Sequence, residues 1–245
     1  SATGRSKTAP RDALLHIASC AAGDVRRAVN LLENAYYSSG KEITKEAVDG
    51  FTPSVIGNFD RDGTVHYDLL SALQKSIRGS DPDAAIFYLA KILEGGDLPG
   101  ACRRLQVTAC EDIGLAYPQG IILAKACVDS ARELGLPEAV IPLADLAVAL
   151  ATAPKSNSAH NAIIAAMEDI QRGAVGDIPR HLKNVHADST GAEKAPAYKY
   201  PHNYPQHYVE QRYLPETLGD RTYYEYGENK TEQAAKRYWD EIKRK

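Results

Sequence analysis

Proline and glycine divide residues 65–173 into pieces of helical length. Proline is tolerated in the first turn of a helix, and glycine favours the position just after the last turn. Within these pieces apolar residues recur at helical spacing, as at Ala85, Leu89 and Ile92. The prolines that open segments are Pro82, Pro99, Pro118 and Pro137, and the closing glycines are Gly95, Gly96, Gly135 and Gly173. We therefore expect residues 65–176 to form one compact domain of five or six helices.

The first 50 residues are expected to form a separate, smaller helical unit. Residues 11–22 have an apolar side, Gly23 is suited to end that helix, and Asp24 can cap the next helix at 25–37. Thr44 can cap a third short helix. Residues 51–64 show no clear periodicity and indicate a linker.

The last part of the chain, 177–245, has a different composition. Nine of the 14 tyrosines lie in the final 48 residues, interleaved with prolines that exclude a long helix. This pattern predicts an irregular strap laid over the helical domain, with at most a short strand near 223–226 and a final helix from about 231. The expected fold class is therefore mainly α.

Composition narrows the functional classes. The net charge is -3, so no overall positive field draws the chain to nucleic acid or a membrane surface, and no apolar run reaches the roughly 20 residues of a membrane span. The polar start without Met indicates a fragment of a longer protein. Four cysteines without a CxxC pair predict buried, reduced thiols and an intracellular, cytoplasmic location; they are Cys20, Cys102, Cys110 and Cys127.

The segment 23–27, GDVRR, is the first candidate binding site. A helix N-terminus carries partial positive charge, and an Arg in its first turn adds a planar donor fork suited to phosphate. An ordinary cap followed by a solvated Arg pair explains the same residues, and spacing alone leaves both readings open.

Several longer motifs point to a family. ASCAAGDVRRAVNLLENA resembles the sensor 2 helix in the lid of clamp-loader-clade AAA+ ATPases. HYDLLSALQKSIRGSDPDAAIFYLAKILEGGDLP, RRLQVTACEDIGLA, APKSNSAHNAI and KYPHNYP…QRYLP follow in the order found in the replication-associated recombination protein A family (RarA, or MgsA). The resemblance runs from about residue 11 to 227.

This resemblance implies a DNA-dependent ATPase of replication forks that assembles as a homotetramer through its C-terminal helical domain. Arg26 would be the sensor 2 arginine, with Gly23 and Asp24 supporting the helix start, and Arg27 has no assigned role. The family further implies ATP and Mg in the parent protein, association with the nucleoid, and contact with single-strand-binding protein. No P-loop is present in this sequence, so the chain alone is expected to hydrolyse no ATP.

Basic residues supply candidate DNA contacts, because phosphate binding needs Lys and Arg but no base-reading motif. Solvated helix faces are the ordinary alternative. An alternative function is a nucleic-acid-binding module in which tyrosines stack on bases, and another is the collar region of a clamp-loader subunit. The candidate contacts are Lys75, Arg78, Arg103, Arg104, Lys199 and Arg212.

Three other patterns are weaker. Within each of the pairs Glu111–Asp112 and Glu168–Asp169 the two carboxylates point about 100° apart, which disfavours acid–base catalysis. The EDIG segment with Glu111 and Asp112 is part of the family motif and is interpreted as a helix–helix hydrogen-bonding or interface feature. The histidine spacings do not fit a helical metal site, so no metal is expected. Residues 155–158, KSNS, form either a phosphate-binding turn or a plain cap by Ser156.

Overall fold

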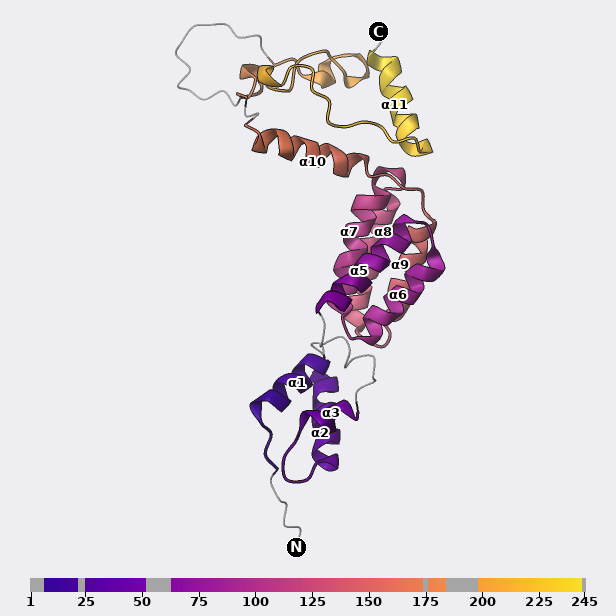
Figure 1. Cartoon of the computed structure of the whole chain (residues 1–245). Coiled ribbons are helices and arrows are strands. Elements are labelled where there is room, and N and C mark those ends of the chain that lie inside the picture. Colours follow the sequence, from indigo (N-terminus) through magenta and orange to yellow (C-terminus); the bar gives the residue numbers. More distant parts are fainter. Residues whose placement is uncertain (1–6, 22–24, 52–62, 174–175, 184–197, 244–245) are drawn as a thin grey trace. The chain divides into compact units, whose positions relative to one another are not determined.

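The computed structural model describes residues 7–21, 25–51, 63–173, 176–183 and 198–243 (Figure 1). Within these ranges the chain consists of helices joined by loops, without a β-strand, which confirms the mainly-α prediction. The short strand expected near 223–226 is wrong. These residues have no regular secondary structure, and the Tyr224 hydroxyl bonds a buried carboxylate instead.

The first three helices share a small core. They are α1 (Arg11–Ala21), α2 (Val25–Ser38) and α3 (Lys45–Asp49). Thr44 caps α3 as expected, because its hydroxyl accepts a hydrogen bond of 3.3 Å from the Ala47 N–H. The side chains of this core are Ala13, Ile17, Cys20, Leu31, Ala35, Ile43 and Val48.

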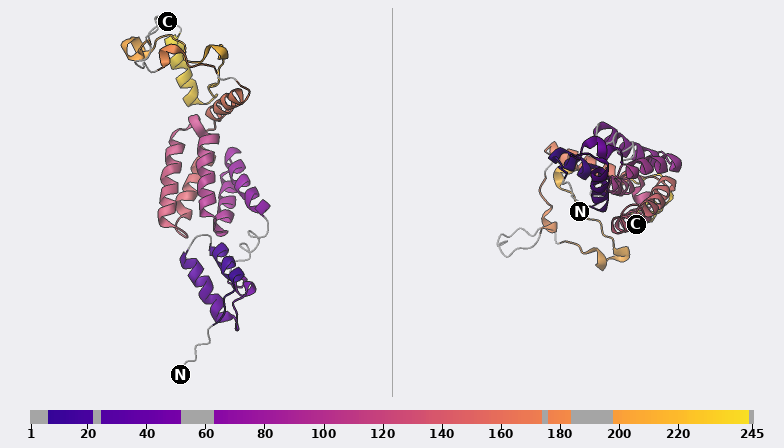
Figure 2. Two further views of the ribbon diagram at one scale, coloured as in Figure 1. Left: turned by 90° about the vertical axis from the view of Figure 1, so that its left-hand side faces the viewer. Right: turned by 90° about the horizontal axis from the view of Figure 1, so that it is seen from below.

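The following helices form a bundle and run side by side in two views (Figures 1 and 2). Asp81 and Asp97 cap two of them, each accepting from the backbone N–H three residues ahead, with a proline in the first turn. Leucine, isoleucine and alanine side chains from all five helices fill one core. The helices are α5 (Gly63–Arg78), α6 (Pro82–Glu94), α7 (Leu98–Thr108), α8 (Gln119–Leu134) and α9 (Val140–Thr152).

The segment after α7 is helical but not α-helical. Residues Ala109–Ile113 form a π-helical turn, η1, and Gly114–Ala116 form a 3-10 turn, η2. Such π turns are rare and break the regular hydrogen-bond pattern. Here the turn carries the adjacent carboxylates Glu111 and Asp112.

The C-terminal part consists of two α-helices and short 3-10 turns. The α-helices are α10 (Ser158–Gln171) and α11 (Lys230–Lys243). The 3-10 turns are η3 (Arg180–Leu182), η4 (Pro201–Asn203), η5 (Pro205–His207) and η6 (Glu216–Leu218).

Two compact units emerge from the contacts. One holds residues 1–113 and 118–153, and the other holds 114–117 and 154–245, so α10 groups with the C-terminal segment. The predicted domain boundaries at 50, 64 and 176 follow chain order, and they stay a prediction.

The cysteine prediction is only partly correct. Cys20 and Cys102 are buried, but Cys127 is half-buried and Cys110 is exposed. Cys110 lies in the π turn η1. None of the described helices combines the length and apolarity that a membrane crossing requires.

Candidate functional site

The start of α2 is the candidate nucleotide-sensing position. The helix begins at Val25, so Arg26 occupies its first turn. Val25 and Val29 are 77% and 55% exposed, which leaves an apolar strip at this helix start uncovered by the described residues. Gly23, Asp24 and the side chain of Arg26 lie outside the described residues, so their roles stay predictions.

A charged network joins α5, α7 and the π turn. The Arg78 guanidinium donates to Asp112 at 2.5 Å and to Glu111 at 3.1 Å. The Gln74 amide donates to both carboxylates at 3.1 and 3.0 Å, and its oxygen accepts from Arg104 at 2.7 Å. Asp112 is only 6% exposed, and its hydrogen bond to Arg78 raises the pKa of that guanidinium.

This network divides the four candidate DNA contacts of the bundle into two pairs. Arg78 and Arg104 are held by carboxylate and amide partners, which confirms helix–helix hydrogen bonding for Glu111 and Asp112. Lys75 and Arg103 are exposed, and within the described residues no ion pair engages them. The sequence could not reveal the pairing of Arg78, because its partners lie 33 and 34 residues away.

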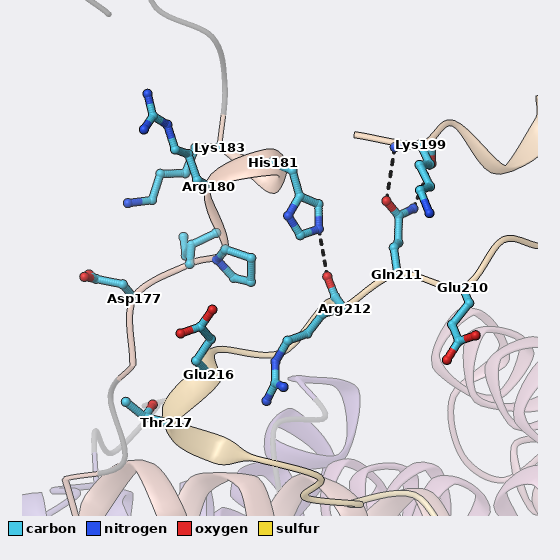
Figure 3. A pocket seen from close by; sticks show the side chains of 12 residues that line it. Asp177, Arg180, His181, Lys183, Lys199, Glu210, Gln211, Arg212, Glu216 and Thr217 are labelled. Atoms are coloured by element: carbon cyan, nitrogen blue, oxygen red, sulfur yellow. Dashed lines mark hydrogen bonds between the residues drawn. The ribbon is translucent and has the colours of Figure 1, made fainter. Parts of the chain in front are cut away.

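The strap lines an open cavity of about 720 Å³. Lys199 and Arg212, the remaining candidate DNA contacts, both line it (Figure 3). Arg180 and Lys183 contribute two more cations from the η3 side, while Asp177, Glu210 and Glu216 add carboxylates. The cavity therefore has a mixed lining with a small excess of positive charge.

Arg212 itself is bound within the strap. Its Nε donates to Leu214 O at 3.1 Å, and its Nη2 donates to Pro215 O at 3.3 Å and Gly219 O at 2.7 Å. The Arg212 carbonyl is 2.8 Å from His181 Nε2, which crosses the cavity (Figure 3). Arg212 thus shapes the cavity wall, whereas the Lys199 side chain forms no hydrogen bond or ion pair within the described residues.

The histidines form no metal site in the described part of the chain. The rings of His202 and His207 lie 4.9 Å apart, but among the described residues no group of three His, Cys, Asp or Glu side chains could hold an ion. His186 lies outside the described residues. Glu168 and Asp169 form surface ion pairs, with Arg172 and Arg221 respectively, both at 2.8 Å.

A buried carboxylate, Glu232, explains the KSNS segment. It is 2% exposed and accepts hydrogen bonds from the Ser158 hydroxyl at 2.5 Å, the Tyr224 hydroxyl at 2.9 Å and the Gly227 N–H at 3.1 Å. The Ser156 hydroxyl in turn accepts from the Ser158 N–H at 3.3 Å. The simple cap predicted at Ser156 is wrong, because Asn157 is the N-cap of α10 and its side chain makes no capping bond.

Hydrogen bonding keeps this buried carboxylate ionised. Burial would raise the pKa of Glu232, but hydrogen bonds from Ser156, Ser158, Asn229 and Gly227 outweigh burial and lower the pKa to about 2. Burial and the same carboxylate raise the pKa of Tyr224 to about 12. The Asn229 side chain also accepts from the Glu232 N–H at 3.0 Å, which satisfies a free N–H group at the start of α11.

Sequence reasoning missed Gln74, Gly114 and Glu232. The spacing N-x-x-E at 229–232 is a capping-box signature and could have indicated Glu232. Gly114 has φ +47°, and a Cβ there would lie 2.7 Å from Ser156 O. No local sequence pattern indicates that the backbone of Gly114 lies this close to Ser156.

The family comparisons give the class of protein, the C-terminal part of an AAA+ ATPase. Residues 79–243 match the family described as MgsA AAA+ ATPase C terminal, and residues 4–78 match the AAA C-terminal domain. The chain belongs to the MgsA (replication-associated recombination protein A) family.

Several curated relatives carry the name Replication-associated recombination protein A. The Bacillus subtilis protein is 45% identical over 94% of this chain and 56% of its own length. The Escherichia coli K12 protein is 35% identical over 90% and 52%, and the Haemophilus influenzae protein is 35% identical over 82% and 47%. The chain therefore spans about half the length of these relatives.

Proposed function

We propose that this chain is the lid and self-association region of a DNA-dependent AAA+ ATPase that acts in replication-associated recombination at damaged forks. The family membership supports an AAA+ ATPase, and the name of the relatives supports a role in replication-associated recombination. The observation that carries the proposal is the start of α2 at Val25, within the residues that match the AAA C-terminal domain. On this proposal the parent protein works in the cytoplasm at the nucleoid and binds ATP with Mg.

Arg26 would link the lid to the nucleotide. The first turn of a helix has N–H groups without helical partners and carries partial positive charge. A guanidinium at this position suits the terminal phosphate of ATP, and the exposed Val25 and Val29 suit contact with an ATPase core. A nucleotide bound at the core would then be sensed by the position of the lid.

Turnover by the protein that includes the ATPase core tests this role. Arg26→Ala is expected to lower DNA-stimulated ATP hydrolysis at least tenfold, and Arg27→Ala is the matched control that should retain it. Full activity of Arg26→Ala would contradict the sensor role. The 245-residue chain alone is expected to show no turnover.

Self-association is tested on the 245-residue chain by light scattering over a concentration series. We expect a homotetramer that dissociates on dilution. A strict monomer at high micromolar concentration would contradict this part of the proposal.

A second candidate function is contact with the DNA backbone at the strap cavity. Its support is that Arg180, Lys183 and Lys199 all line this cavity. Lys183→Ala with Lys199→Ala should weaken binding to a fluorescent single-stranded oligonucleotide and reduce its salt dependence. An absence of binding at low salt would contradict it.

A further inference from the structure

Helices α6 and α9 lie side by side and border an open, mainly apolar groove of about 640 Å³ (Figure 1). On α6 the lining residues recur at intervals of three and four, so they form one face of that helix. The start of α9 supplies the opposite wall. The apolar side chains that bear on the argument are Ile86, Leu89, Ala90 and Leu93 on α6 and Val140 and Ile141 on α9.

The groove is long enough to take one face of a partner helix. From Ile86 to Glu94 the α6 wall extends about 12 Å, at 1.5 Å per residue. An amphipathic helix that binds in a groove inserts apolar side chains at i, i+4 and i+7, and these span about 10 Å. The length of the wall therefore matches about two turns of a bound helix.

The charged residues that line the groove are two carboxylates, Glu94 and Asp145, and no Lys, Arg or His of the described residues lines it. Both are exposed, and within the described ranges no ion pair engages either of them. Glu94 is the last residue of α6, where the helix dipole disfavours a negative charge. Lys91, in the same turn, directs its ammonium group over the Phe87 ring, 5.6 Å from the ring centre. A cation beside Glu94 would therefore be stabilised by the carboxylate and the helix end together.

This charge decides between the possible occupants of the groove. Nucleic acid and anionic membrane surfaces are repelled by carboxylates. A second copy that covered the groove with its own groove would bring four carboxylates together with no cation between them, and like charges across an interface are costly. An apolar helix that carries Lys or Arg matches both the walls and the charge.

We propose that the groove between α6 and α9 is a docking site for a basic amphipathic helix of a partner protein. Apolar side chains of the partner pack against Leu93 and Ile141, and its Lys or Arg side chains pair with Glu94 and Asp145. The site adds a partner surface to the proposed function and depends on neither nucleotide sensing nor self-association.

Phage display of a random 14-residue peptide library against the 245-residue chain tests the site. The Ile141→Asn variant serves for counterselection, because it places a polar side chain in the groove wall at a residue that is 64% exposed. We expect the selected peptides to share apolar residues at i, i+4 and i+7 together with Lys or Arg. Acidic peptides, peptides without this spacing, or no enrichment over the counterselection would overturn the proposal.

Fluorescence polarisation with the most enriched peptide, synthesised with a fluorescein label, locates the contact. Ile141→Asn should weaken binding at least tenfold. The control, Ile122→Asn, makes the same change at an isoleucine of α8 that is 71% exposed and does not line the groove, and it should bind like the unsubstituted chain. Equal affinities of the two variants would overturn the assignment to the groove.

A double variant, Glu94→Gln with Asp145→Asn, tests the ion pairs with the same peptide. These changes keep the size of each side chain and remove its charge. Exposed ion pairs contribute modestly, so binding at low salt should weaken about fivefold and lose most of its dependence on salt. Unchanged affinity and salt dependence would overturn the assignment of a basic partner.

Sedimentation velocity separates a partner protein from a second copy of the chain. Ile141→Asn is expected to leave the association state of the 245-residue chain unchanged. If this variant abolishes an association that the unsubstituted chain and Ile122→Asn both show, a second copy occupies the groove and the proposal is overturned.

Discussion

The hydroxyl of Ser158 donates to the carboxylate of Glu232, and this bond joins residues 74 positions apart in the sequence. The bond ties the first turn of α10 to the first turn of α11. Tyr224, Gly227 and Asn229 direct their donors to the same carboxylate. The KSNS segment therefore holds the C-terminal unit together.

Replacing Glu232 should destabilise that unit in a pH-dependent way. The ordinary pKa of 4.5 falls to about 2, which corresponds to about 3 kcal/mol of stability. Because the pKa of the folded state is the lower one, this contribution is present above about pH 5 and is lost as the pH falls toward 2. Urea denaturation between pH 7 and 3 should show less stability and a flatter acid dependence for Glu232→Gln.

The matched control is Glu228→Gln. Glu228 is exposed, and no hydrogen bond or ion pair engages its side chain within the described residues. Equal acid sensitivity of the Glu232→Gln variant and the unsubstituted chain would contradict the role assigned to Glu232.

Gly114→Ala should be more damaging than Gly173→Ala. Both glycines have positive φ, +47° and +90°, where glycine is favoured over any residue with a Cβ. At Gly114 the Cβ would also lie 2.7 Å from Ser156 O, whereas nothing lies within 4 Å at Gly173. Thermal unfolding of the two variants measures the difference, and a Gly114→Ala variant as stable as Gly173→Ala would show that the contact can relax at no cost.

Asp112→Asn should weaken the bundle. The substitution removes the charge that pairs with Arg78 and leaves Gln74 facing an amide, at a side chain that is 6% exposed. Loss of such a partner costs about 1–3 kcal/mol. Chemical denaturation should detect this loss, while Asp129→Asn, which breaks an exposed pair with Lys125, should cost at most about 0.5 kcal/mol. Similar effects of the two variants would argue against the network.

Arg212→Ala should loosen the strap. It removes three hydrogen bonds to backbone carbonyls at Leu214, Pro215 and Gly219. Limited proteolysis should therefore cleave the variant faster between 198 and 220. Arg212→Lys should not restore resistance, because a single ammonium group lacks the planar fork. Lys199→Ala is the control, and cleavage of that variant at the Arg212→Ala rate would contradict the specific role of Arg212.

Helix positions were predictable because proline and glycine act locally. The starts at Pro82 and near Pro99 and the end at Gly135 follow from one or two residues each. The π turn at Ala109–Ile113 was not predictable, because apolar periodicity does not report a change of hydrogen-bond register within a helix.

The site was less accessible to sequence reasoning than the fold. Arg78 and Arg104 were predicted beside DNA, but their charges meet side chains 30 to 34 residues away. A single sequence shows that a cation is present without showing which anion lies opposite. The family motif KSN could be recognised in the sequence. Its structural role could not, because that role depends on Glu232 near the far end of the chain.

The C-terminal unit can complete its folding only at the end of synthesis, because residues near the end of the chain close it. The Thr231 hydroxyl donates to Ala116 O at 2.9 Å across 115 positions, and Glu232 beside it joins α10. A ribosome that has delivered α9 has supplied every helix of the bundle, yet η2 and α10 still lack the partners that α11 brings. A chain that stops before residue 230 should therefore keep a folded bundle and carry an unfinished, protease-sensitive tail.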